Sequence, residues 1–287
     1  MIEVSGLTYT YPKAASPALR GLEFRIAQGE IFGFLGPSGA GKSTTQKILI
    51  GLLRGYQGRA RALGCEVGAW GGDYYERVGV AWELPNHFLK LTARENLRYF
   101  AALYRGKTRR PEELLERVGL LADADTPVGQ FSKGMRVRLN LACALVHSPD
   151  LLFLDEPTSG LDPVNSRKVV ELVREERAAG RTVFLTTHNM AIADELCDRV
   201  AFIADGRLAA VDAPRALKLR YGAPTVRVEY AGAGGPERRD FPLAGLGECA
   251  SFGELLRGQA VQTIHSQEAS LEQIFIRLTG RSLEWDA

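Results

Sequence analysis

The sequence predicts an α/β domain with a mainly parallel sheet, followed by a small α+β domain. Three observations support this fold class. A glycine-rich loop at residues 36–44 lies between an apolar run and a segment with helical spacing. A second continuous apolar run, at 151–154, is typical of a strand buried on both faces. Predicted strands and helices then alternate up to residue 211 with short connections, which favours a parallel sheet covered by helices.

The glycine-rich loop indicates a site for a nucleoside triphosphate. Its residues are Gly36, Pro37, Ser38, Gly39, Ala40, Gly41, Lys42, Ser43 and Thr44. A loop of this kind directs backbone N–H groups at phosphate oxygens, and the following helix adds about half a positive charge at its N-terminus. Lys42 can reach the β- and γ-phosphates, and the hydroxyl of Ser43 can bind Mg²⁺. The spacing of the glycines and Lys42, the predicted strand and helix on either side, and the hydroxyl of Ser43 all favour this interpretation over an ordinary turn with a surface lysine.

The elements around this loop are predicted to be strands. They cover residues 1–4, 22–26, 30–35, 59–63 and 77–82. The last two lie in a glycine-containing stretch consistent with a small β subdomain beside the nucleotide. Tyr9 and Tyr11 lie in the loop after the first strand. An exposed tyrosine there can stack on a purine, or it can fill the space under the phosphate loop, and these residues alone leave both possibilities open.

Residues 92–147 are predicted to be mainly helical. Thr92 and Glu95 have the spacing of a capping box, which opens a helix through Tyr104. Pro111 begins a second helix, and a third is predicted over 133–145. The basic run at 107–110 is interpreted as a solvated loop between helices rather than a binding patch.

The later elements complete two domains. Helices are predicted at 163–179 and 191–197, and strands at 182–185, 200–204 and 207–211, the last two joined by an Asp205-Gly206 hairpin turn. A small domain over 221–287 follows, joined near residues 212–224. Its strands are predicted at 225–230, 239–243 and 261–265, with a loop at 231–236, a helix at 252–256 and a last helix that Ser270 and Gln273 cap and Gly280 ends.

Composition excludes several classes of protein. The chain has 287 residues and a net charge of +2, without the basic footprint of a dedicated nucleic-acid binder. Its four cysteines form no CxxC pair, which suits a reducing cytosol and argues against a disulfide scaffold or a zinc site. The sequence shows neither a signal peptide nor the ~18 apolar residues of a membrane span. We therefore expect a cytoplasmic protein that reaches a membrane only through a partner.

Asp155 and Glu156 end the apolar run at 151–154 and suggest phosphate-transfer chemistry. An aspartate there can hold Mg²⁺, usually through water, while the adjacent glutamate polarises an attacking water. Two carboxylates are needed because the metal occupies one of them. An acidic pair after a strand can also cap a helix, but its position ~110 residues after the phosphate loop favours the catalytic interpretation.

Six motifs in one order resemble those of the ATP-binding-cassette (ABC) ATPases. Besides the phosphate loop and the Asp155-Glu156 pair, they include Phe131-Ser132-Lys133-Gly134-Met135, Ser159-Gly160-Leu161-Asp162, His188 and Tyr11. In that family these four positions are the signature motif, the D-loop, the switch histidine and the adenine-stacking aromatic residue. The resemblance covers residues 1–220 and implies a P-loop NTPase fold with a mainly parallel sheet, an antiparallel β subdomain and a helical subdomain at 92–147.

The resemblance also implies a dimer. Ser132 and the backbone around Gly134, at a helix N-terminus, form an anion-binding cradle. In the family this cradle faces the γ-phosphate held by a second subunit, so that two ATP molecules lie between two head-to-tail copies. Glu156 then activates water, Asp155 orders the metal and His188 stabilises the γ-phosphate.

Two positions depart from the family pattern. Glu83 stands where glutamine is usual, and its carboxylate can still bind metal-bound water, although it adds negative charge beside a polyphosphate. The signature motif reads Ser-Lys-Gly-Met instead of Ser-Gly-Gly-Gln, but it keeps Ser132 and Gly134. We therefore expect ATP and Mg²⁺ as cofactors, with Ser43, Asp155 and Glu83 as metal ligands.

The end of the chain indicates a subfamily. Residues 270–281 and 89–97 are similar to segments of ATPase subunits from ABC-2-type exporters, including drug-resistance pumps. This similarity implies an ATPase subunit on the inner face of the cell membrane, which works as a dimer with a separately encoded permease. Nucleic acid is not expected as a partner. The helical region and the segment after Glu83 are expected to meet the permease. The alternative is a soluble ABC ATPase acting on ribosomes or DNA, but such proteins commonly carry two cassettes or long coiled coils.

Overall fold

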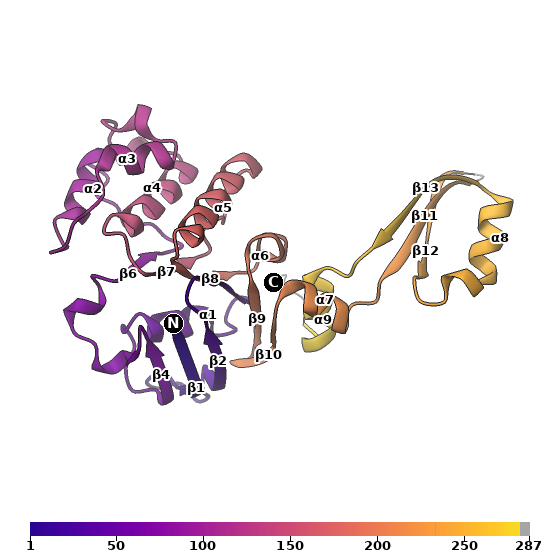
Figure 1. Cartoon of the computed structure of the whole chain (residues 1–287), viewed down its shortest axis with the longest axis horizontal. Coiled ribbons are helices and arrows are strands. Elements are labelled where there is room, and N and C mark those ends of the chain that lie inside the picture. Colours follow the sequence, from indigo (N-terminus) through magenta and orange to yellow (C-terminus); the bar gives the residue numbers. More distant parts are fainter. Residues whose placement is uncertain (233, 282–287) are drawn as a thin grey trace. The chain divides into compact units, whose positions relative to one another are not determined.

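The computed structural model describes residues 1–232 and 234–281, which divide into two compact units, Met1–Asp212 and Ala213–Arg281 (Figure 1). The predicted boundary between residues 220 and 221 falls at the end of helix α7 (Pro214–Tyr221), a segment that is predicted to belong to the connection near residues 212–224. The structure assigns this whole helix to the second unit, where it packs against α9 (Leu271–Thr279). The end of the predicted C-terminal domain, 282–287, lies outside the described residues.

A six-stranded sheet in the order β10-β9-β3-β8-β7-β6 forms the centre of the first unit. Its strands are β3 (Ile31–Leu35), β6 (Val78–Ala81), β7 (Leu151–Asp155), β8 (Thr182–Thr187), β9 (Arg199–Ala204) and β10 (Arg207–Asp212). Every pairing is parallel except β9 with β10. Strands β3 and β8 are buried at every residue, as expected for central strands of a parallel sheet that is covered on both faces.

Two predictions about this sheet have different outcomes. The Asp205-Gly206 hairpin is confirmed, because Ala204 pairs with Arg207 and both turn residues have positive φ, as a type I′ turn demands. The assignment of residues 77–82 to the small β subdomain is wrong. Strand β6 pairs with β7 in the parallel sheet, since its apolar residues are buried there beside another apolar strand.

A four-stranded antiparallel sheet, in the order β2-β1-β4-β5, shares its core with the parallel sheet. Its strands are β1 (Ile2–Tyr9), β2 (Leu19–Ile26), β4 (Gln57–Ala62) and β5 (Cys65–Glu66). Phe24 of β2 stacks on Phe32 of β3, with ring centroids 5.6 Å apart, and also meets Phe184 of β8. These aromatic contacts join the two sheets into one folding unit.

The region predicted to be helical contains α2 (Ala93–Ala101), α3 (Pro111–Arg117) and α4 (Lys133–Leu145), which gather in one part of the unit (Figure 1). The capping box of α2 is confirmed, because Thr92 accepts from the backbone of Glu95 and the Glu95 carboxylate accepts from the backbone of Thr92. The remaining helices of the unit are α1 (Lys42–Leu49), α5 (Pro163–Ala178) and α6 (Met190–Leu196).

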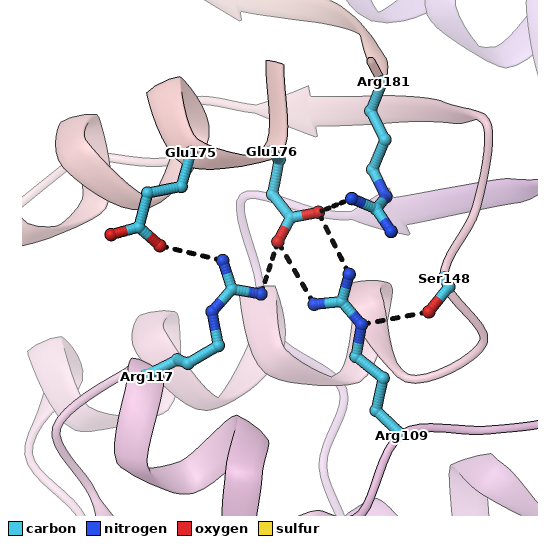
Figure 2. A network of polar contacts seen from close by, with 6 residues as sticks. All are labelled: Arg109, Arg117, Ser148, Glu175, Glu176 and Arg181. Atoms are coloured by element: carbon cyan, nitrogen blue, oxygen red, sulfur yellow. Dashed lines mark hydrogen bonds and ion pairs between the residues drawn. The ribbon is translucent and has the colours of Figure 1, made fainter. Parts of the chain in front are cut away.

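A buried charge cluster joins this helical region to α5 (Figure 2). The Glu176 carboxylate, whose side chain is only 2% exposed, contacts Arg109 at 3.2 Å, Arg117 at 2.5 Å and Arg181 at 2.8 Å. The Arg109 side chain is 14% exposed and also donates to the hydroxyl of Ser148. The prediction of a solvated loop at 107–110 is therefore wrong for Arg109, because its guanidinium neutralises a carboxylate far along the chain.

The second unit is a small α+β domain, as predicted. Its three-stranded antiparallel sheet has the order β12-β11-β13, and its elements besides α7 and α9 are β11 (Thr225–Gly232), β12 (Gly235–Pro242), α8 (Ala250–Gly258) and β13 (Ala260–Gln267). The loop predicted at 231–236 is shorter than expected, because β11 and β12 pair up to Gly232 and Gly235; residue 233 lies outside the described part. The capping box of α9 and its end at Gly280 are confirmed.

The core of this unit is small, and it contains Val226, Val228, Phe241 and Leu255. Across residues 1–232 and 234–281, no helix combines the length and the apolar character needed to cross a membrane.

Candidate functional site

The glycine-rich loop connects β3 to α1 at the carboxyl end of the parallel sheet. Gly36 directly follows β3 and lies against the neighbouring strand β9. A Cβ atom at this position would be 2.2 Å from the carbonyl oxygen of Ile203, so no larger residue fits. Lys42 is the first residue of α1, and the loop amides lie at the N-terminus of that helix.

The side chain of Lys42 is buried against the first residues of the phosphate loop. Its Nζ donates to the carbonyl oxygens of Gly36 at 2.5 Å and Pro37 at 3.1 Å, and only 8% of the residue is exposed. Burial lowers the pKa of Lys42, while the negative charges of nearby carboxylates act in the opposite direction. Those carboxylates belong to Glu156, Asp155 and Glu83. The structure therefore brings four of the predicted site residues into one electrostatic cluster.

The two carboxylates after β7 are held by the neighbouring strand β8. Asp155 ends β7, and its Oδ1 accepts a hydrogen bond from the hydroxyl of Thr186. Glu156 follows in the left-handed region with φ 46°, and its backbone N–H donates to the carbonyl oxygen of Thr186 at 3.0 Å. Its Oε2 accepts from the hydroxyl of Thr187 at 3.0 Å, and its Oε1 lies 2.8 Å from Nδ1 of His188.

Glu156 and His188 differ in their exposure to solvent. Glu156 is 9% exposed, whereas the side chain of His188 is 58% exposed. A buried carboxylate with both oxygens engaged has a defined orientation, and the exposed imidazole beside it can meet a ligand that arrives from solvent. This arrangement suits a carboxylate that acts on a water molecule next to a bound phosphate.

The two tyrosines before the phosphate loop occupy different environments. Tyr9 is the last residue of β1 and is buried, so it lies in a strand and not in the predicted loop. Tyr11 is 37% exposed, its ring meets Tyr9 edge-on at 5.0 Å, and its hydroxyl lies 3.1 Å from Oγ1 of Thr44. Tyr9 therefore provides the packing, while the face of Tyr11 stays partly open and its role as an adenine platform stays a prediction.

The predicted signature residues form a separate group. Ser132 is exposed and caps α4, since its Oγ accepts from the backbone N–H of Met135 at 3.2 Å. The Lys133 side chain packs over Gly160, and Asp162 caps α5 by accepting from Asn165. The hydrogen bond from the Asn165 backbone lowers the pKa of Asp162.

The signature group is not joined to the phosphate loop. Within residues 1–232 and 234–281, no hydrogen bond or ion pair connects Phe131–Met135 or Asp162 to residues 36–44. One chain therefore presents two sets of predicted site residues, the Lys42 cluster and the signature group.

Sequence reasoning missed the roles of Thr186 and Thr187. Both are fully buried at the end of β8, directly after its apolar run Val183–Leu185, and each donates a hydrogen bond to one of the two carboxylates. Polar residues that interrupt an apolar strand beside a predicted acidic pair are the signal that could have revealed these contacts.

The oxygen groups of the site fit a magnesium ion that binds together with a nucleotide. Among the residues that the structure describes, no group of three or more His, Cys, Asp or Glu side chains could hold a metal alone. Mg²⁺ is commonly held by one or two carboxylates together with substrate phosphates and water. Asp155 and the exposed hydroxyl of Ser43 supply hard oxygen atoms of this kind.

Comparison with known proteins gives two family matches. Residues 19–159 match the model of the ABC transporter family. Residues 224–268 match the model of the fluoroquinolone efflux ABC transporter C-terminal domain.

Curated relatives extend over nearly the whole chain. The chain is 58% identical over 284 residues to a fluoroquinolones export ATP-binding protein of Mycobacterium tuberculosis, covering 99% of this chain and 94% of that protein. It is 38% identical over 280 residues to the Nod factor export ATP-binding protein I of Sinorhizobium fredii, covering 92% and 82% of the two chains.

Solved structures match about three quarters of the chain. A dimeric ATP-binding cassette in a post-hydrolysis state, bound to ADP and Pi, superposes with a TM-score of 0.68 at 26% identity and covers 74% of this chain and 98% of the other. An ATP-binding subunit of an ABC transporter superposes with a TM-score of 0.69 at 30% identity, with coverages of 77% and 93%.

Proposed function

The chain belongs to the ATP-binding subunits of ABC transporters, and we propose that it powers the export of fluoroquinolone-like drugs through a separately encoded membrane permease. It is an ATPase subunit of an exporter. The observation that carries the proposed substrate is the 58% identity to a fluoroquinolones export protein, which extends over 99% of the chain and therefore includes both units.

The Lys42 cluster is the proposed hydrolytic half-site. Lys42 and the amides of residues 36–44 bind the phosphates, and Tyr11 stacks on the adenine. Mg²⁺, when bound, neutralises charge on the phosphates; Ser43 and Asp155 are its proposed ligands, with Glu83 as a third.

Glu156 is the proposed base that polarises the attacking water. Its Oε1 lies 2.8 Å from Nδ1 of His188. We propose that His188 in turn contacts the γ-phosphate. The geometry around Glu156 supports this assignment. Its carboxylate is buried and oriented by hydrogen bonds, and it lies near Lys42, the proposed phosphate-binding lysine.

A second copy of the chain supplies the other half of the site. The signature residues Phe131, Ser132, Lys133, Gly134 and Met135, together with Asp162, are the proposed wall that closes over ATP in the partner. Ser132 and Lys133 are exposed and have no polar contact with the phosphate loop of their own chain in the described part. The related dimeric cassette bound to ADP and Pi supports this arrangement.

The permease is proposed to bind near Glu83, which would hold the subunit at the inner face of the cell membrane. Large apolar side chains are exposed just after this residue, with Leu84 81%, Phe88 44% and Leu89 51% accessible. Exposed apolar side chains that gather in one segment are typical of protein interfaces. A polar substitution such as Leu84→Ser is therefore expected to weaken co-purification with the permease and to leave basal ATPase activity unchanged.

The transport proposal is tested in proteoliposomes that contain the chain together with the permease encoded by an adjacent gene. Addition of a fluoroquinolone is expected to stimulate ATP hydrolysis and to produce ATP-dependent drug movement across the vesicle. A permease complex that hydrolyses ATP normally but neither responds to nor moves fluoroquinolones would contradict the substrate and leave the ATPase assignment standing.

The catalytic assignment is tested with Glu156→Gln. This variant is expected to bind ATP, lose turnover and accumulate an ATP-bound dimer on size-exclusion chromatography. Glu171→Gln, an exposed carboxylate on α5, is the control and keeps full activity. Full hydrolysis by Glu156→Gln would remove this residue from the proposed role.

Glu83→Gln tests the departure from the family pattern. We expect basal hydrolysis to stay largely intact, because an amide oxygen can replace one carboxylate oxygen as a hydrogen-bond acceptor. A complete loss would show that the negative charge itself is needed.

A further inference from the structure

We propose that Thr186 and Thr187, the last two residues of β8, are positioning residues for the ATPase reaction and that each holds one of the two carboxylates after β7. The inference rests on the proposed roles of Asp155 in metal binding and of Glu156 in water activation. It adds a separate structural cause for each role.

Thr186 fixes the carboxylate at the metal side. The parallel register of β7 and β8 places it opposite Asp155, and its hydroxyl donates to Asp155 Oδ1. The threonine is fully buried, and its carbonyl oxygen accepts the backbone N–H of Glu156 at 3.0 Å. One residue therefore orients the aspartate side chain and the backbone that presents the glutamate.

Thr187 fixes the carboxylate at the water side. Its Oγ1 accepts the backbone N–H of Asn189 at 3.0 Å and lies 3.0 Å from Glu156 Oε2. A hydroxyl has a single proton, and a carboxylate oxygen only accepts. The proton of Thr187 is therefore directed at Glu156, and the orientation of this hydrogen bond is determined by the backbone of the following loop.

Two adjacent threonines are needed because successive residues of a strand point to opposite faces of the sheet. A single hydroxyl on β8 cannot serve both Asp155, the last residue of β7, and Glu156, which directly follows that strand. Valine has the same branched shape and would satisfy the packing of a buried strand equally well. Burying a hydroxyl there is costly unless it is hydrogen-bonded, so the contacts with the carboxylates account for threonine at these positions.

The two contacts predict different defects. Loss of the Thr186 hydroxyl leaves Asp155 without its donor, so the affinity for the divalent cation is expected to fall. Loss of the Thr187 hydroxyl frees the Glu156 carboxylate to rotate, so kcat is expected to fall while ATP affinity is unchanged. Hydrogen bonds to charged groups contribute enough that each effect should be roughly 10- to 100-fold.

The experiment compares Thr186→Val and Thr187→Val with Thr182→Val in the full-length protein. Thr182 begins the same strand, is equally buried, and accepts from the backbone N–H of Gly29 at 2.9 Å, away from both carboxylates. Each variant is measured for kcat, for ATP affinity, for thermal unfolding, and for Mn²⁺ affinity by electron paramagnetic resonance with a non-hydrolysable ATP analogue. Serine variants at residues 186 and 187 restore the hydroxyl, and alanine variants replace valine ones that do not fold.

Thr186→Val is expected to weaken Mn²⁺ binding, and Thr187→Val to lower kcat and prolong the ATP-bound dimer with unchanged ATP and Mn²⁺ affinity. Thr182→Val should change only the unfolding temperature, and both serine variants should recover most of the lost function. Equal effects of all three valine variants, or no recovery with serine, would overturn the inference. If Glu156→Gln is inactive while Thr187→Val behaves as the unmodified protein, the inference alone fails; if Glu156→Gln is fully active, the proposed catalytic assignment fails first.

Discussion

Replacement of Glu176 by glutamine is expected to destabilise the first unit strongly. The carboxylate side chain is 2% exposed and contacts the guanidinium groups of Arg109, Arg117 and Arg181 (Figure 2). Among the six residues labelled in Figure 2, the second carboxylate is that of Glu175, which pairs with Arg117 at 2.8 Å. Glutamine keeps the volume of the side chain but removes its charge, and three cations then remain together in a confined space.

The size of this effect follows from the number of ion pairs and their burial. Two unit charges 4 Å apart interact by about 4 kcal/mol at an effective dielectric constant of 20. The cost of burying the carboxylate offsets part of the three attractions, but removing one partner leaves the others buried without compensation. The loss is about 3–5 kcal/mol for a buried ion pair treated in this way, so we expect the free energy of unfolding to fall by that amount.

Urea denaturation followed by circular dichroism measures the loss, with Glu175→Gln as the matched control. The Glu175 side chain is 62% exposed and pairs with one arginine, so its replacement should cost about 0–1 kcal/mol. The two residues are adjacent on α5 and undergo the same chemical change. Equal losses for the two variants would refute the reasoning, because burial and the number of partners would then have no effect.

Three further predictions concern other buried groups. Burial lowers the pKa of His147 to about 4, so between pH 6.5 and pH 4 the imidazole is protonated in the unfolded chain but neutral in the folded chain. The neutral imidazole therefore contributes about 3 kcal/mol to the free energy of unfolding above pH 6.5, and this contribution is lost as the pH falls to about 4. His147→Gln should flatten this part of a stability–pH curve measured by urea denaturation. Gln46 is fully buried, and both its amide atoms lack a hydrogen-bond partner among the described residues, so Gln46→Leu should raise stability by about 1–2 kcal/mol in thermal unfolding; a loss would show that the amide is satisfied. Gly36→Ala should abolish binding of a fluorescent ATP analogue, because the added Cβ would lie 2.2 Å from the carbonyl oxygen of Ile203; normal binding would contradict this.

Local signals in the sequence predicted most of the first unit. The capping box of Thr92, the hairpin turn at Asp205 and the apolar runs of β3 and β7 each depend on residues within a few positions of one another. Such features are set by backbone geometry and by burial of a whole strand. They do not require knowledge of which distant segment lies alongside.

Helix α7 was missed for the opposite reason. Over Pro214–Tyr221 only Pro214 and Leu217 are buried, and the apolar Leu219 is 78% exposed, so the apolar residues of this short segment do not mark a single buried face. Its position in the second unit depends on α9, more than fifty residues later, and on the hydrogen bond from Arg277 to the carbonyl oxygen of Tyr221. Arg109 was misinterpreted in the same way, because its partner Glu176 lies in another element.

The polar contacts of the candidate site depend partly on local sequence signals and partly on which distant segments lie side by side. The sequence predicts Asp155 and Glu156 because they end an apolar run, but the apolar residues alone do not give the register between β7 and β8, on which the contacts with the threonines depend. A strand buried on both faces reads as continuously apolar, so its residues carry little information about register. The exception is a polar residue within such a strand, because its burial without a partner would be costly. In β8 the apolar run stops at Leu185, and the two hydroxyl groups that follow imply acceptors on the neighbouring strand at the same level of the sheet. Asp155 and Glu156 are those acceptors, so the interruption of one strand and the acidic end of the other determine the register together.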